Sequence, residues 1–97
     1  MSTNKPPTKM FITIKIMPES PEVDLEHLKN HIKEVADAFE ASMNPKTEIE
    51  PVAFGLEALK VTLLLDETKG SEELCEEIAK IHGVSSAEVI DMRRLIS

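Results

Sequence analysis

The order of its periodic segments is the feature that most constrains the fold of this chain. Residues 9–17 alternate apolar with other side chains, which predicts a strand with one buried face, and residues 59–65 do the same. Two weaker strands are predicted at residues 47–52 and 86–92. The last of these alternates irregularly, which indicates a β-bulge.

Two further segments have apolar residues at helical spacing. The first helix begins after Ser20 or Asp24, because either side chain can accept hydrogen bonds from the free N–H groups of a first turn. It fades near Ala41. The second begins at Ser71 as its N-cap and ends near Gly83. The helical residues expected to be buried are Leu25, Leu28, Ile32, Val35, Leu74, Ile78 and Ile81.

The resulting order is strand, helix, strand, strand, helix, strand. This order predicts an α+β fold, a ferredoxin-like βαββαβ sandwich in which two helices cover one face of a four-stranded antiparallel sheet. We expect one domain over residues 9–97, preceded by a disordered tail at residues 1–8. The fold hosts many unrelated functions, so it does not decide the activity.

Composition narrows the functional class. The formal net charge is −7, whereas direct nucleic-acid binding usually depends on a basic face. No apolar run reaches the roughly 20 residues needed to cross a membrane. The N-terminus shows no secretory pattern and the chain has a single cysteine, Cys75, so we expect a reducing, cytoplasmic setting.

The candidate chemical sites are weak. His27 and His31 have the spacing of a helical metal pair, but both lie off the apolar stripe of their helix, which favours two solvated positions. Cys75 has no cysteine partner and is typical of a small core residue. We therefore predict no catalytic residue, no metal site and no cofactor.

Two other segments suggest contacts with a partner. Phe54 and Gly55 follow each other in a connection between strands, where an aromatic side chain is poorly placed to fill its own core. The structural alternative is that Phe54 covers an edge of that core. Near the end of the chain, Arg93 and Arg94 stand among apolar residues, and their structural alternative is an ordinary solvated end.

Three segments support a family resemblance. Residues 52–60 resemble the loop signature of the translation elongation factor one-beta family. Residues 17–25 look like the first loop of the short archaeal form, and residues 91–95 are similar to its C-terminal end. The three occur in the expected order, and the resemblance extends from about residue 9 to residue 96.

The resemblance implies a guanine nucleotide exchange factor that promotes GDP release from the GTPase elongation factor one-alpha, with its GDP and Mg²⁺. An exchange factor performs no covalent chemistry, so the resemblance also implies that the protein is not an enzyme. The implied partner-binding residues are Phe54, Gly55, Arg93 and Arg94. Phe54 occupies the position of an aromatic that inserts near the switch region of the GTPase. Arg94, with Arg93 beside it, matches a basic residue that reaches the Mg²⁺ and phosphate site, which is lysine in the eukaryotic form. Arginine and lysine are not interchangeable there.

Two expectations and one alternative follow from these assignments. Phe54 should be exposed in the free protein, and Arg94 should lie on the same side of the molecule, within one interface. The alternative function is a small-molecule-binding regulatory domain of ferredoxin-like fold, which predicts a pocket at the helix–strand loops. A plain interaction module without exchange activity is a third possibility.

Overall fold

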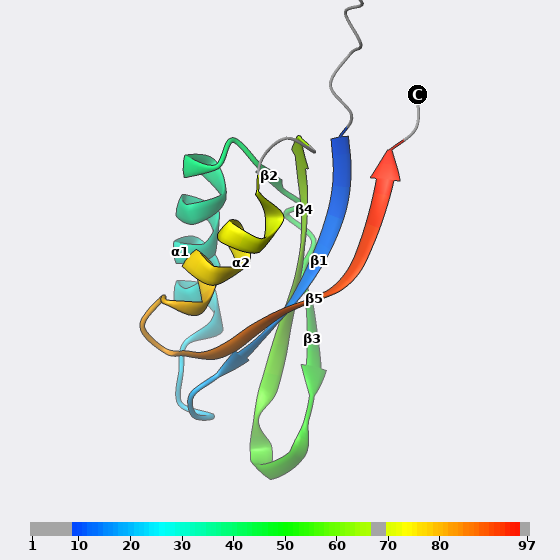
Figure 1. Ribbon diagram of the computed structural model, residues 1–97. Coiled ribbons are helices and arrows are strands. Elements are labelled where there is room, and N and C mark those ends of the chain that lie inside the picture. Colours follow the sequence, from blue (N-terminus) through cyan, green and yellow to red (C-terminus); the bar gives the residue numbers. More distant parts are fainter. Residues whose placement is uncertain (1–8, 67–69, 96–97) are drawn as a thin grey trace, which may run out of the picture.

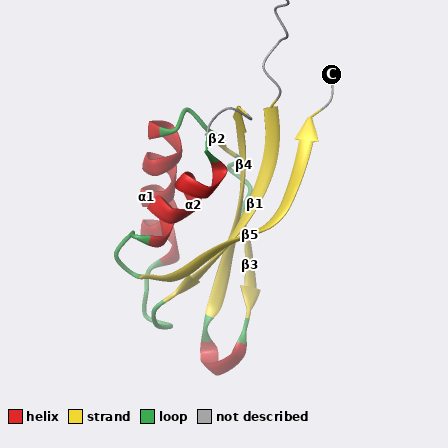
Figure 2. Ribbon diagram, in the orientation of Figure 1, coloured by secondary structure: helices red, strands yellow, loops and turns green. Residues whose placement is uncertain are grey.

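A computed structural model describes residues 9–66 and 70–95 and has the predicted architecture. All strand pairs are antiparallel, and both helices lie on one face of the sheet (Figures 1 and 2). The α+β ferredoxin-like prediction is therefore confirmed, whereas the expected tail at residues 1–8 lies outside the described part. In chain order the elements are β1 (Lys9–Pro18), α1 (Leu25–Ala38), β2 (Ser42–Met43), β3 (Glu48–Pro51), η1 (Ala53–Gly55), β4 (Glu57–Asp66), α2 (Ser71–Ala79) and β5 (Val84–Leu95).

The sheet has five strands rather than four. The strands are ordered β2–β4–β1–β5, and β3 pairs with β4 on the same edge as β2. The strand predicted at residues 47–52 is β3, and β2 is an additional short strand ahead of it. Asn44 turns the chain between the two, because its side-chain oxygen accepts the N–H of Lys46 at 2.9 Å, while Pro45 has no N–H to donate to a ladder.

The core lies between the helices and one face of the two central strands. Leu28, Ile32, Leu74 and Ile78 are fully buried, as predicted. Leu25, Val35 and Ile81 are only partly buried against this core, because they lie at its margin. The strand residues of the core cluster are Met10, Ile12, Ile14, Ile16, Leu59, Val61, Leu63 and Leu65, together with Val84 of β5. Neither described helix has the length and apolar character needed to cross a membrane.

Asp24 is the N-cap of α1. Its Oδ1 atom accepts the N–H of Glu26 at 3.0 Å and that of His27 at 3.4 Å. The Ser20 hydroxyl instead accepts the N–H of Glu22 at 3.3 Å, in the turn before the helix. The choice that the sequence left open is therefore decided in favour of Asp24.

The predicted cap of α2 is wrong by one residue. Gly70 is the N-cap, in an extended backbone conformation, and Ser71 is the first helical residue. No side chain caps this helix. Acidic residues in its first turn, Glu72 and Glu73, supply the negative charge that favours a helix N-terminus.

Strand β5 is longer than predicted and contains the expected bulge. Asp91 pairs with Thr13, but Val89 pairs with Ile14, so the register skips Ile90. From Asp91 to Leu95 the pairing with β1 is regular again. Among the described residues, β1 is the only strand that pairs with β5.

The face of the sheet opposite the helices contains an ion network across three strands. A carboxylate oxygen of Glu50 on β3 lies 3.3 Å from the Lys60 ammonium of β4 and 3.6 Å from the Lys15 ammonium of β1. The hydrogen bond and charge of Lys60, followed by the charge of Lys15, hold the pKa of Glu50 below its ordinary value.

We expect Glu50→Gln to lower the melting temperature slightly at neutral pH. A carboxylate whose pKa is depressed on folding stabilises the protein above its unfolded pKa, and this contribution disappears as the pH falls through the folded pKa. The difference between the variant and the parent should therefore vanish in acid. Glu34→Gln, at an exposed position of α1, is the control. An equal pH dependence in both variants would contradict the network.

Candidate functional site

Phe54 lies at the tip of the hairpin that joins β3 to β4. The loop is closed by the Val52 N–H, which donates to the Leu56 carbonyl at 2.8 Å, and by the Leu56 N–H, which donates to the Ala53 carbonyl at 3.3 Å. The Phe54 side chain is 93% exposed. The alternative in which Phe54 covers its own core is therefore wrong. This tip projects from one end of the sheet, beyond both helices (Figure 1).

The backbone at the tip is left-handed at two consecutive residues. Phe54 has a φ of 62° and Gly55 a φ of 75°. Glycine adopts this region freely, but a residue with a Cβ atom loses about 1–2 kcal/mol there. Phe54 thus combines a strained backbone with an apolar side chain in water, and neither stabilises the free protein. Such a combination points to a contact outside the chain.

The loop between β1 and α1 adjoins the Phe54 tip. A small hollow of about 30 Å³ is lined by Pro18, Ser20 and Leu25 from this loop region and by Gly55 and Glu57 from the hairpin, among others. Two of the three segments that resemble the elongation factor one-beta family are therefore side by side. The sequence did not predict this neighbourhood, since about thirty residues separate the segments and no spacing pattern connects them.

Arg94 lies at the opposite end of the sheet from Phe54. It pairs with Met10, which pairs on its other side with Leu65, near the end of β4. Phe54 instead precedes Glu57, the first residue of β4. The eight residue steps from Glu57 to Leu65 span about 26 Å in an extended strand.

The expectation that Phe54 and Arg94 share one side is therefore wrong. The reason is strand direction: β1 is antiparallel to both β4 and β5, so β4 and β5 run parallel to each other. The loop before β4 and the end of β5 must then lie at opposite ends of the sheet, as Figure 1 shows for the hairpin between β3 and β4 and for the tip of the β5 arrow.

The two arginines also point to opposite faces of the sheet. Successive side chains of a strand alternate, and Arg94 pairs with the buried Met10 whereas Arg93 pairs with the exposed Phe11. Arg94 is thus on the helix side and Arg93 on the open side. The Arg93 Nε donates to the Asp91 carboxylate on the same strand at 3.1 Å. Arg93 and Arg94 therefore cannot contact the same point on a partner.

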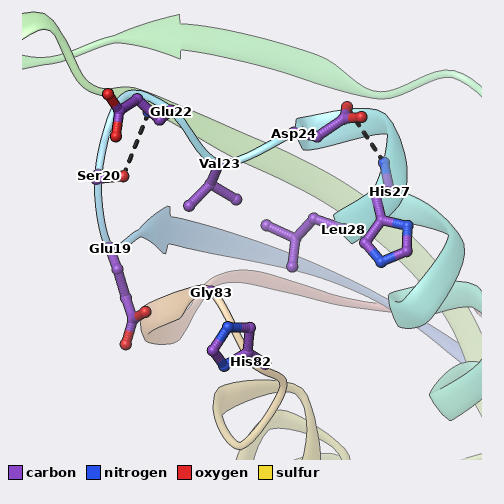
Figure 3. Close-up of a pocket in the computed structure, with 9 residues that line it drawn as sticks. All are labelled: Glu19, Ser20, Glu22, Val23, Asp24, His27, Leu28, His82 and Gly83. Carbon is purple, nitrogen blue, oxygen red and sulfur yellow. Dashed lines mark hydrogen bonds between the residues drawn. The ribbon is translucent and has the colours of Figure 1, made fainter.

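A pocket of about 350 Å³ lies where the small-molecule alternative predicts one. It is formed by the loop between β1 and α1 and by the segment after α2 (Figure 3). Asp24 in this pocket already caps α1. His27, drawn at its border, has its ring centroid 4.5 Å from that of His31. Within residues 9–66 and 70–95, no group of three or more histidine, cysteine or acidic side chains could hold a metal ion.

Comparison with known proteins identifies the family. The family model described as EF-1 guanine nucleotide exchange domain matches residues 11–95. The chain belongs to this family. The resemblance seen in the sequence is therefore confirmed, and membership supports a guanine nucleotide exchange role in translation elongation.

Individual relatives agree over most of their length. Elongation factor 1-beta of Methanosphaera stadtmanae is 48% identical over 86 residues, which cover 86% of this chain and 92% of the relative. The protein of the same name from Methanothermobacter thermautotrophicus is 48% identical, over 87% of this chain and 93% of that relative. The protein of the same name from Metallosphaera sedula is 40% identical, over 91% of this chain and 97% of that relative.

Similar solved structures support the fold alone. The ACT domain from GTP pyrophosphokinase of Chlorobium tepidum has a TM-score of 0.60 at 18% identity, over 86% of this chain and 100% of that domain. The C-terminal domain of the MgtC protein from Mycobacterium tuberculosis has a TM-score of 0.62 at 14% identity, over 96% of this chain and 94% of that domain.

We expect Gly55→Ala to destabilise the protein by about 1–2 kcal/mol, because alanine loses that much in the left-handed region. No atom lies within 4 Å of the position that the new Cβ would take, so a steric clash does not contribute. Gly55→Asn should cost less, since asparagine tolerates this conformation better. Urea unfolding of the two variants measures the difference. Equal stability of Gly55→Ala and the parent would contradict the tip geometry.

Proposed function

We propose that this protein promotes GDP release from the GTPase elongation factor 1-alpha in the cytoplasm, without covalent chemistry and without contacting nucleic acid directly. An exchange factor acts by binding the nucleotide-free GTPase more tightly than the nucleotide-bound form, which shifts the population toward release. The observation on which the proposal depends is the 93% exposure of Phe54, in the segment that resembles the family signature.

Phe54 serves in this proposal as the anchor on the GTPase. Buried aromatic anchors dominate many interfaces because they remove a large apolar area from water while ordering few torsions. The hydrogen-bonded loop from Val52 to Leu56 holds the anchor in place before binding, and Gly55 permits the left-handed turn. Little ordering is then needed when the complex forms.

Arg94 serves as the group that disturbs the Mg²⁺ and phosphate site. A cation placed there competes electrostatically with Mg²⁺, whose loss leaves the nucleotide phosphates less well held. Because Arg94 lies about 26 Å from the base of the Phe54 hairpin, an interface that includes both must extend along the sheet. We therefore propose two separated contacts on one GTPase rather than one compact patch.

We expect Phe54→Ala to slow GDP release about 30-fold or more, because truncating a central anchor typically costs ~2 kcal/mol. The melting temperature should barely change, since the side chain is almost fully exposed. Release of fluorescent GDP from the GTPase measures the rate. Ile49→Ala, at a 53% exposed residue of the same hairpin, is the control and should exchange normally. An unaffected rate in Phe54→Ala would refute the anchor.

Arg94→Glu should reduce the exchange rate more than Arg94→Ala. Both remove the competing cation, and the glutamate also repels the phosphates. Arg93→Ala is the matched control: its residue faces the other side of the sheet and should affect exchange less. Raising the Mg²⁺ concentration should slow the GDP release that the parent protein promotes, because Mg²⁺ and Arg94 compete for the same site. An exchange rate that changes neither with Arg94→Glu nor with the Mg²⁺ concentration would exclude this role of Arg94.

A further inference from the structure

The outer edge of β5 is the longest unpaired strand edge on the described part of the protein. This strand spans Val84–Leu95 and pairs with β1 alone. An unpaired edge presents N–H and C=O groups that can bind another strand. The edges of natural sheets are commonly blocked by proline, by charged side chains or by bulges. Strand β5 has no proline, and its charged residues Asp91 and Arg93 have opposite signs, so a partner strand can neutralise them. Its bulge at Ile90 leaves the regular pairing of residues 91–95 intact.

The terminal part of this edge is exposed and partly apolar. Residues 91–94 are all exposed, and they extend away from the two helices (Figure 1). Met92 is 53% exposed and Ile90 is 43% exposed. Pairing with another strand would remove these groups and the free backbone edge from water together.

We propose that β5 pairs antiparallel with β5 of a second copy of this chain, about a two-fold axis through Met92. In this register Asp91 of each copy lies opposite Arg93 of the other copy. The two residues share the open face of the sheet, as their 3.1 Å hydrogen bond within one strand shows. Opposite charges across strands stabilise a pair, and like charges destabilise it.

The charges also disfavour the neighbouring registers of the same antiparallel pairing, in which the helices of both copies still lie on one face of the joined sheet. An axis through Asp91 would place two aspartates opposite each other, and an axis through Arg93 or Arg94 would oppose two arginines. The axis through Met92 instead places two exposed apolar side chains together. The pairing is isologous, so it closes as a dimer and does not propagate. It joins the two sheets into one, with all four helices on the same face.

Edge pairing over a few residues buries less than the ~800 Å² per partner of a standard interface. The dimer is therefore expected to be weak and to depend on concentration. Arg94 lies two residues from the axis, so the second copy would stand beside it and obstruct a GTPase that approaches this end of the strand. Only this last consequence rests on the proposed function, because the pairing itself does not involve the GTPase.

Cross-linking tests the axis directly. In a Cys75→Ser background, Met92→Cys should form a disulfide-linked dimer in air, since opposite Cα atoms of antiparallel strands lie about 4.5–5.5 Å apart, within disulfide reach. Ile49→Cys is the control, equally exposed at 53% but on the other edge of the sheet. It should stay monomeric. Equal cross-linking of both variants, or none at Met92→Cys, would overturn the proposal.

A charge exchange tests the register. By sedimentation equilibrium, the parent should dimerise at high concentration, and Asp91→Arg and Arg93→Asp should each abolish the dimer by opposing like charges. The double variant Asp91→Arg/Arg93→Asp should restore it, because the opposite charges meet again. A parent that stays monomeric up to about 1 mM, or single variants that dimerise normally, would overturn the proposal. GDP release, measured separately, decides the proposed exchange function.

Discussion

The pairing of β1 with both β4 and β5 is the constraint on which the rest of the structure depends. Its residues Ile12, Ile14 and Ile16 are completely buried under the helices, so their register with both neighbours is fixed. A slip by one residue would turn this whole set toward water. Because β1 is antiparallel on both sides, β4 and β5 must run in the same direction. The hairpin tip and the C-terminal arginines are therefore held at opposite ends of one rigid sheet.

The fold could be predicted where its pattern was long and regular. The strands around β1 and β4 and both helical stripes follow clear periods, and they proved correct. Strand β2 was missed, because two residues are too few to show a period. The Ser71 cap was wrong, because Gly70 and Ser71 are both acceptable caps and the choice depends on where the backbone turns into the helix.

The candidate site was predicted only in part, for a physical reason. The exposure of Phe54 follows from an aromatic beside a glycine in a short connection. The left-handed backbone of Phe54 does not follow from the sequence, because this conformation is uncommon for a residue other than glycine and arises where the hairpin closes. The separation of Phe54 from Arg94 depends on strand direction across the sheet. A family signature names such residues without placing them relative to one another.

The two proposals for the end of β5 exclude each other at any one moment. With a second copy beside Arg94, a GTPase is obstructed from approaching the same end of the strand. Binding equilibria that compete for one surface are coupled, and the coupling acts equally in both directions. Excess GTPase must then dissociate the dimer, and a high concentration of this chain must weaken its own apparent affinity for the GTPase. Phe54, at the far end of the sheet, stays accessible in both states, so the second copy obstructs the Arg94 contact and leaves the Phe54 contact open.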